Sequence, residues 1–301
     1  MTSEPVWEIP EPLSRCEVRL DADTVTTLRR HGNPAGPRLV LSHGNGLAID
    51  LYYPFWSRLA DEFDLIVYDL RNHGWNTVGA SEKHNVPTLI RDQERILEAI
   101  DGHYGNKPKI GVFHSASALV TLFLSPQSNS LAAQILFDPP LCKPGKSHIE
   151  FDEAAERAAA LTRRRGYRFH TQEDFVELLR YVPAFTRVVP GVLDLMARTT
   201  LRRSANGQAY ELRCPREYEA QIMDYVRGFS PLVDLRALPC PTKIVGADPT
   251  LPFAYLPTID LSDIVAVEYD FLPETTHYLQ LENPEECVVV LREFLKENGL
   301  L

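Results

Sequence analysis

Residues 109–118 have the sequence KIGVFHSASA, and this stretch decides the fold. The apolar run at 110–113 predicts a short buried strand, and the residues after Ser115 have the spacing of a helix. A strand that turns directly into a helix places the turn residue at the sheet edge, at the positive end of the helix dipole. The Ser115 hydroxyl would then be exposed beside a backbone N–H that can stabilise an oxyanion. The alternative is that Ser115 is an ordinary small residue or N-cap at this junction.

The composition is typical of a globular protein. A chain of 301 residues can form one large α/β domain with an insertion, or two small domains. Its 44% hydrophobic and 24% charged residues are sufficient for a full core. The formal net charge of −10 argues against nucleic acid or an anionic membrane as a partner, because phosphate binding depends on cationic side chains.

The five cysteines are odd in number and widely separated, without CxxC pairs or zinc spacing. This pattern favours idle thiols in a reducing compartment. The N-terminal residues show no signal peptide, and no apolar run is long enough to span a bilayer. We therefore expect a cytoplasmic protein, monomeric or homodimeric, without a metal or another cofactor.

Strands and helices alternate on both sides of a long central segment. An antiparallel hairpin is predicted from 17–20 and 24–28, and a final helix with Asn283 as its N-cap. Further helices are predicted at 51–59 and 87–100. Buried strands are predicted at 38–42, 64–70, 110–113, 133–137, 242–245 and 264–271. Such a pattern is typical of a mostly parallel sheet covered on both faces, which binds ligands at the carboxyl ends of its strands.

The central segment has a different pattern, with no convincing strand between about residues 141 and 238. Prolines separate four helix-like stretches, at 151–164, 171–182, 192–201 and 215–227. We therefore predict a core domain formed by residues 1–140 and 239–301. Residues 141–238 would form an all-helical cap inserted between two strands of the core sheet.

Three residues with complementary chemistry fall at the carboxyl ends of predicted strands: Ser115, Asp248 and His277. A serine hydroxyl is a weak nucleophile and needs a neutral imidazole to accept its proton. The imidazole in turn needs a carboxylate to hold it in the correct tautomer. The sequence therefore contains all the components of a nucleophilic triad on one sheet edge.

Four motifs in this order resemble the capped α/β-hydrolases over about residues 17–298. They are His43-Gly44-Asn45-Gly46, the turn at 69–74, His114-Ser115 and Thr276-His277. The resemblance implies an α/β-hydrolase fold with a helical cap that shapes the substrate pocket. It implies little about the substrate, because this fold hosts many chemistries.

The resemblance also implies a role for individual residues. Ser115 would be the nucleophile, His277 the general base and then the general acid, and Asp248 the residue that orients His277. The backbone N–H groups of Asn45 and Ala116 would form the oxyanion hole. His43 and His73 would make structural hydrogen bonds, and His114 would support the site.

The turn around Ser115 departs from the family pattern, which has small residues, usually glycine, two positions before and after the nucleophile. These positions hold Phe113 and Ser117. The Phe113 ring must therefore point away from the helix, or the local geometry must differ. Ser117 is an alternative nucleophile, but that choice leaves the His114-Ser115 dipeptide unexplained.

The triad acid is a second departure. Asp248 lies two residues after Gly246, where the family usually has a spacing of three. A turn shortened by one residue accounts for this difference, so Asp248 is the predicted acid. Asp138, at the end of the preceding strand, is the alternative because some family members carry the acid there.

The resulting functional prediction is a serine hydrolase that cleaves a small-molecule carboxylic ester or lactone through an acyl-enzyme. A serine at position 115 excludes the epoxide hydrolases and haloalkane dehalogenases of this fold, which need a carboxylate nucleophile there. Two alternatives remain open, a carbon–carbon bond hydrolase or lyase with the same triad, and a non-catalytic receptor. Three cap aromatic residues either line the pocket or pack in the core: Tyr181, Phe185 and Tyr225.

Overall fold

A computed structural model of the protein describes residues 6–127, 130–141, 146–251 and 267–301. Its main strands are β1 (Ser14–Arg19), β2 (Val25–Gly32), β3 (Arg38–Ser42), β4 (Asp64–Val67), β5 (Lys109–His114), β6 (Leu131–Phe137), β10 (Thr242–Gly246) and β11 (Glu268–Phe271). They form one sheet in the order β1-β2-β4-β3-β5-β6-β10-β11.

The sheet is antiparallel where β2 pairs with β1 and β4, and parallel from β4 to β11. This arrangement confirms the predicted hairpin and the mostly parallel sheet. The first three residues of the strand predicted at 264–271 lie outside the described residues. All parallel strands end at the same edge, so their loops converge there.

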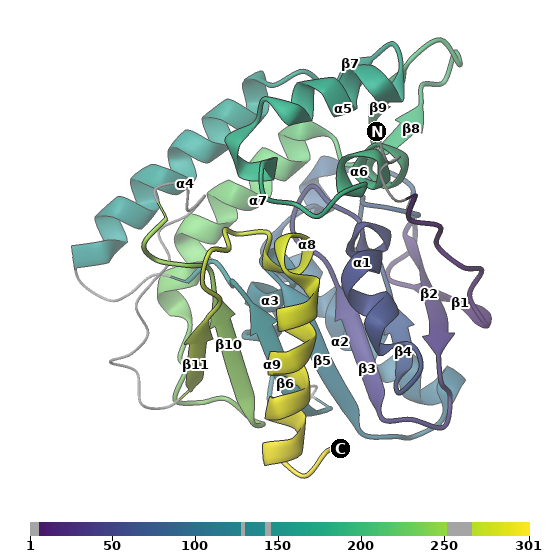
Figure 1. The fold of residues 1–301 in the computed structure, drawn as a ribbon, viewed down its shortest axis with the longest axis vertical. Coiled ribbons are helices and arrows are strands. Elements are labelled where there is room, and N and C mark those ends of the chain that lie inside the picture. The colour runs from purple at the N-terminus through teal and green to yellow at the C-terminus, as the bar shows by residue number, and fades with distance from the viewer. Residues whose placement is uncertain (1–5, 128–129, 142–145, 252–266) are drawn as a thin grey trace.

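Helices cover both faces of the sheet (Figure 1). On one face lie α1 (Tyr53–Trp56) and α9 (Pro284–Glu297), and on the other lie α2 (Val86–Tyr104) and α3 (Ala116–Thr121). Each face has its own core of fully buried aliphatic and aromatic side chains. The side chain of Asn283 accepts a hydrogen bond from the Glu286 N–H at 3.2 Å, which confirms the predicted N-cap of α9.

The segment between β6 and β10 lies above the carboxyl ends of the parallel strands (Figure 1). It contains helices α4 (Lys146–Arg164), α5 (Gln172–Arg180), α6 (Val192–Thr200) and α7 (Arg216–Phe229). It also contains β7 (Arg168–Phe169), β8 (Leu201–Arg203) and β9 (Tyr210–Leu212), which form a separate antiparallel sheet. The short α8 (Leu279–Glu282) directly precedes α9.

The second sheet shows that the prediction of an all-helical cap was wrong. Its strands have only two or three residues, which is too short to show the alternation that identifies a strand in a sequence. The signal that could have revealed it is Asn206-Gly207 between β8 and β9, because Asn-Gly is typical of hairpin turns. Gly207 has a positive φ of 69°, which glycine adopts readily.

Hydrogen bonds from Arg213 and α7 to the loop after β4 hold the cap against the core. The Arg213 Nη1 donates to the Gly74 carbonyl at 2.8 Å, just before α7 begins. Within α7, the Gln221 Nε2 donates to the His84 carbonyl, also at 2.8 Å. These contacts hold α7 above the strand ends, so one face of this helix lies over Ser115.

The Phe113 side chain fits into β5 because Gly111 precedes it by two residues on the same side of the strand. A Cβ atom at Gly111 would lie 2.5 Å from Cε2 of Phe113 and 3.0 Å from Cδ1 of Leu131. The ring therefore extends back along β5 and away from the turn into α3. The absence of a side chain at Gly111 therefore leaves room for the Phe113 ring.

We expect Gly111→Ala to lower the free energy of unfolding by about 1–3 kcal/mol, because the added methyl group overpacks the site. Replacing Phe113 by Leu in the same chain should recover part of this loss. Gly102→Ala in α2 is the matched control, since a Cβ atom there has no neighbour within 4 Å. It should stabilise the protein by about 0.5–1 kcal/mol through helix propensity. Urea titration measures the free energy of unfolding of all three variants. Equal changes in this free energy for Gly111→Ala and Gly102→Ala would contradict the interpretation.

Candidate active site

Ser115, His277 and Asp138 form a chain of hydrogen bonds at the carboxyl edge of the sheet. The Ser115 Oγ lies 2.9 Å from Nε2 of His277, and Nδ1 of His277 lies 2.5 Å from Oδ2 of Asp138. All three residues are at least nine-tenths buried. For the Ser115 hydroxyl to donate to Nε2, His277 must carry its proton on Nδ1, where it donates to Asp138. This arrangement can transfer a proton from the hydroxyl to the imidazole.

The backbone of Ser115 has an uncommon conformation, with φ 52° and ψ −114°. Its N–H donates to the Phe137 carbonyl at 2.9 Å, and its carbonyl accepts from the Leu119 N–H at 2.9 Å. These two bonds fix the turn between β5 and α3. A positive φ at a residue other than glycine persists only where the surrounding structure holds it, and such residues cluster at functional sites.

Ser117, the alternative nucleophile, directs its hydroxyl to the backbone. Its Oγ donates to the His114 carbonyl at 3.0 Å and accepts from the His114 N–H at 3.1 Å. The hydroxyl therefore braces the turn. The geometry favours Ser115 because its hydroxyl is the one that contacts His277.

The contact between Asp138 and His277 corrects the prediction that Asp248 orients this histidine. The Asp248 carboxylate accepts hydrogen bonds from the Thr250 N–H at 2.8 Å and from the Glu274 N–H at 2.8 Å. Together with the Thr250 hydroxyl, these donors lower the pKa of Asp248. Asp138, the alternative, directly follows β6, which pairs with β5, whereas Asp248 follows β10, one strand farther away.

Asn45 and Ala116, whose backbone N–H groups are predicted to form the oxyanion hole, both line the cavity beside Ser115. Asn45 lies between two anchored glycines, since the Gly44 N–H donates to the Tyr52 hydroxyl at 3.2 Å and the Gly46 N–H to Nε2 of His73 at 2.9 Å. Ala116 is the first residue of α3, where an N–H has no partner inside its helix. Both groups are therefore candidates to stabilise an oxyanion.

Comparison with known protein families shows which family the chain represents. A model described as the alpha/beta hydrolase family matches residues 39–290. The chain belongs to this family. No curated protein sequence matches it significantly.

Solved structures share the fold of this α/β-hydrolase over nearly their whole length. An E-2-(acetamidomethylene)succinate hydrolase has a TM-score of 0.74 and 16% identity, covering 94% of this chain and 99% of its own. A thioesterase domain from the curacin biosynthetic pathway has a TM-score of 0.70 and 15% identity, with 93% and 99% covered. A thermophilic esterase from Thermogutta terrifontis has a TM-score of 0.64 and 20% identity, with 94% and 98% covered. At these identities, the similarity establishes the fold.

In this α/β-hydrolase, His114 links the loop that carries His277 to the loop that carries Asn45. Its Nδ1 lies 2.6 Å from the Tyr52 hydroxyl, and its Nε2 lies 2.7 Å from the carbonyl oxygen of His277. Burial lowers the pKa of His114 well below its usual value, so the ring is neutral. With Tyr52 donating to Nδ1, Nε2–H donates to the carbonyl and holds the backbone of His277 in place. No sequence pattern around Tyr52 predicts this contact with His114.

Two further histidines hold the loops of this edge through backbone hydrogen bonds. Nε2 of His43 accepts from the Leu70 N–H at 3.0 Å, and Nε2 of His73 accepts from the Gly46 N–H. Burial lowers the pKa of both rings, which keeps them neutral and able to accept. Their geometry is that of structural hydrogen-bonding residues.

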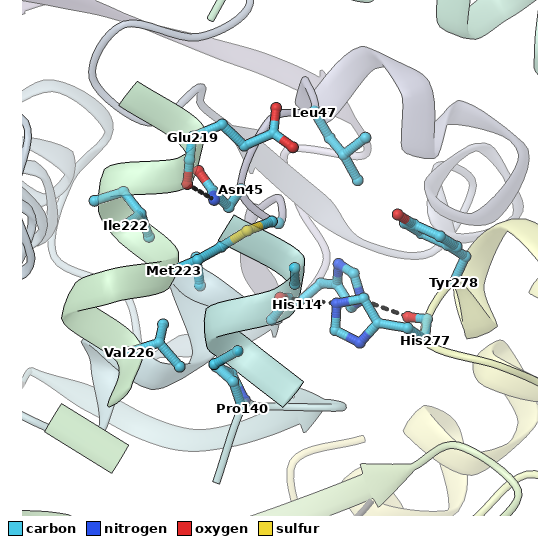
Figure 2. A pocket seen from close by; sticks show the side chains of 15 residues that line it. Asn45, Leu47, His114, Pro140, Glu219, Ile222, Met223, Val226, His277 and Tyr278 are labelled. Carbon is cyan, nitrogen blue, oxygen red and sulfur yellow. Dashed lines mark hydrogen bonds between the residues drawn. The ribbon is translucent and has the colours of Figure 1, made fainter. Parts of the chain in front are cut away.

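Two cavities meet beside the candidate triad. The smaller, about 50 Å³, lies at Ser115 and is otherwise mostly apolar, with Ile222, Met223 and Val226 of α7 on one side (Figure 2). The larger, about 410 Å³, lies within the cap and includes Phe185 in its lining. Among the residues that the structure describes, four line both cavities: Asn45, Leu47, Glu219 and Tyr278.

The other two cap aromatic residues do not line these cavities. Tyr181 is 77% exposed, and the Tyr225 ring packs on Phe229.

Glu219 is a further residue at the cavities that the sequence reasoning missed, although a signal was present. It precedes Ile222, Met223 and Val226 by three, four and seven residues, so it occupies the apolar stripe of its helix.

The described ranges contain no group of three or more His, Cys, Asp or Glu side chains that could hold a metal ion. Within those ranges, no helix combines the length and the apolar composition needed to cross a bilayer.

We expect the free energy of unfolding to fall as the pH is lowered from 6.5 to about 4, in part because of His84. Burial, assisted by Arg71, lowers the pKa of His84 from 6.5 to about 4. The unfolded chain therefore binds a proton in this range that the folded chain excludes. His84→Gln should remove about 3 kcal/mol of this pH dependence. Urea titrations at pH 4, 5, 6 and 7 measure the free energy of unfolding of the wild type and the variant. The same change with pH in both proteins would contradict the prediction.

Proposed function

We propose that this protein is a serine hydrolase that cleaves a carboxylic ester or lactone of a small molecule. The observation that carries the proposal is the hydrogen-bonded chain from Ser115 through His277 to Asp138. Membership of the α/β-hydrolase family and the apolar cavity at Ser115 support it. No step of the proposed reaction uses a cofactor or a metal.

In the first half-reaction, the Ser115 Oγ attacks the carbonyl carbon of the ester while Nε2 of His277 accepts the hydroxyl proton. The Asp138 carboxylate stabilises the imidazolium through the hydrogen bond to Nδ1. The negative charge that develops on the carbonyl oxygen is stabilised by the N–H groups of Asn45 and Ala116. The C–O bond of the ester then breaks, and His277 returns its proton to the leaving alcohol.

In the second half-reaction, a water molecule attacks the acyl group on Ser115. His277 accepts a proton from this water, and the same two N–H groups stabilise the second oxyanion. The bond between the acyl group and Oγ breaks, and His277 protonates Oγ. The products are a carboxylic acid and an alcohol, which are joined in one molecule when the substrate is a lactone.

Removal of the Ser115 hydroxyl tests the nucleophile. Ser115→Ala should abolish labelling by a fluorophosphonate probe and reduce kcat for p-nitrophenyl butyrate by at least about 10³-fold. Ser117→Ala is the matched control and should still be labelled. Mass spectrometry of the labelled peptide identifies the modified residue. An unlabelled wild-type protein that does not cleave esters would instead favour the receptor alternative.

Separate amide substitutions test the assignment of the triad acid. Asp138→Asn should lower kcat by about 10³–10⁴-fold, because an amide cannot hold His277 in the required tautomer or stabilise its charged form. Asp248→Asn should lower kcat by less than about tenfold, since an amide oxygen can still accept from the Glu274 N–H. Ester hydrolysis by both variants gives the comparison. A larger loss for Asp248→Asn would restore the assignment made from the sequence.

A further inference from the structure

The junction between the two cavities carries two hydrogen-bond acceptors that the proposed reaction does not use. They are side-chain oxygens of Asn45 and Glu219, two residues that line both cavities. Figure 2 shows Asn45 beside Glu219, with His114 and His277 farther along the same cavity. A substrate bound at Ser115 and extending into the larger cavity would pass these acceptors.

The Glu219 carboxylate is held at this junction by its surroundings. Glu219 is 5% exposed, and its carboxylate forms an ion pair with Arg165. It lies directly over the loop that carries Asn45, since a Cβ atom at Gly46 would be 2.4 Å from its Oε2. Burial raises the pKa of Glu219 despite the attraction of Arg165. The carboxylate is therefore poorly solvated and would gain from another donor.

Asn45 is fixed by the cap but leaves its acceptor unused. Its Nδ2 donates to the backbone carbonyl of Glu219 at 2.7 Å, which determines the orientation of the amide. The opposite atom, Oδ1, is buried, and no group in the described part of the chain donates to it. A buried acceptor without a donor is unfavourable, so this position favours a ligand that supplies one.

We propose that the substrate is an ester with a hydroxyl group near its scissile carbonyl and an apolar chain beyond it. The hydroxyl donates to Asn45 Oδ1 or to the Glu219 carboxylate, and the chain occupies the larger cavity. A neutral donor fits better than a cation because Arg165 already balances the charge of Glu219. This inference rests on the proposed ester hydrolysis and specifies its substrate class.

Matched pairs of esters test this preference. Methyl octanoate is compared with methyl 2-hydroxyoctanoate and methyl 3-hydroxyoctanoate, and octyl acetate with 2-hydroxyoctyl acetate, by titration of the released acid. The first pairs place the hydroxyl on the acyl side and the last on the alcohol side. At least one hydroxylated ester should have a kcat/KM at least about tenfold higher than its plain partner, because the plain ester leaves the acceptors unpaired.

Substitutions at the junction should remove the preference. Glu219→Met replaces the carboxylate by an apolar group of similar length, and Asn45→Ala removes the amide while keeping the backbone N–H. In each variant, the ratio of kcat/KM between the hydroxylated and plain esters should fall at least threefold. Glu217→Met is the matched control on the same helix, with an exposed side chain, and should keep the wild-type ratio.

Two results separate failure of this inference from failure of the proposed function. Equal kcat/KM values for every pair in an active wild-type enzyme would overturn the hydroxyl preference and leave Ser115 as the nucleophile. Absence of both cleavage and fluorophosphonate labelling would overturn the ester hydrolase itself. Calorimetric binding of the same pairs to Ser115→Ala tests the preference without turnover, and equal affinities would also overturn it.

Discussion

The backbone turn at Ser115 is the constraint on which the rest of the site depends. A positive φ at this residue directs the side chain away from the sheet and toward the edge where the parallel strands end. The surrounding residues accommodate this turn. Gly111 provides space for the Phe113 ring, the Ser117 hydroxyl binds the His114 backbone, and Gly44 permits close approach of the neighbouring loop. A side chain at position 44 would collide with the His114 ring, because its Cβ would lie 2.7 Å from Nδ1.

His114 connects this turn to the loop that carries Asn45 and to the loop that carries His277. Its ring lies between the Tyr52 hydroxyl, which also binds the Gly44 N–H, and the carbonyl of His277. One neutral imidazole therefore ties the loop of the candidate oxyanion hole to the loop of the candidate base. A charged ring at this position would be costly, because its surroundings are fully buried. Burial thus stabilises the protonation state that this linkage requires.

The fold could be predicted from the sequence because the central parallel strands are mainly apolar runs and the motifs fall at their ends. The acid could not be chosen in the same way, since Asp138 and Asp248 both follow parallel strands. The choice depends on the path of the loop to His277, and Asp248 holds that loop at Glu274. The strands of the cap were too short to show a period. Tyr52 contributes through contacts with residues distant in sequence, for which a local pattern contains no signal.

At Glu219 the cap both excludes water from the cavity and pairs a buried carboxylate. Its helix presents apolar side chains to the cavity at Ser115, and excluding water there strengthens the hydrogen bonds of the candidate triad and oxyanion hole. An acidic residue in the same stripe opposes that effect unless it is paired. Arg165 provides one partner from the cap, and the Glu219 backbone carbonyl binds the Asn45 side chain below. The cap is thus linked through Glu219 to the loop that would stabilise the oxyanion, so the packing of the cap over the site also helps to position that loop.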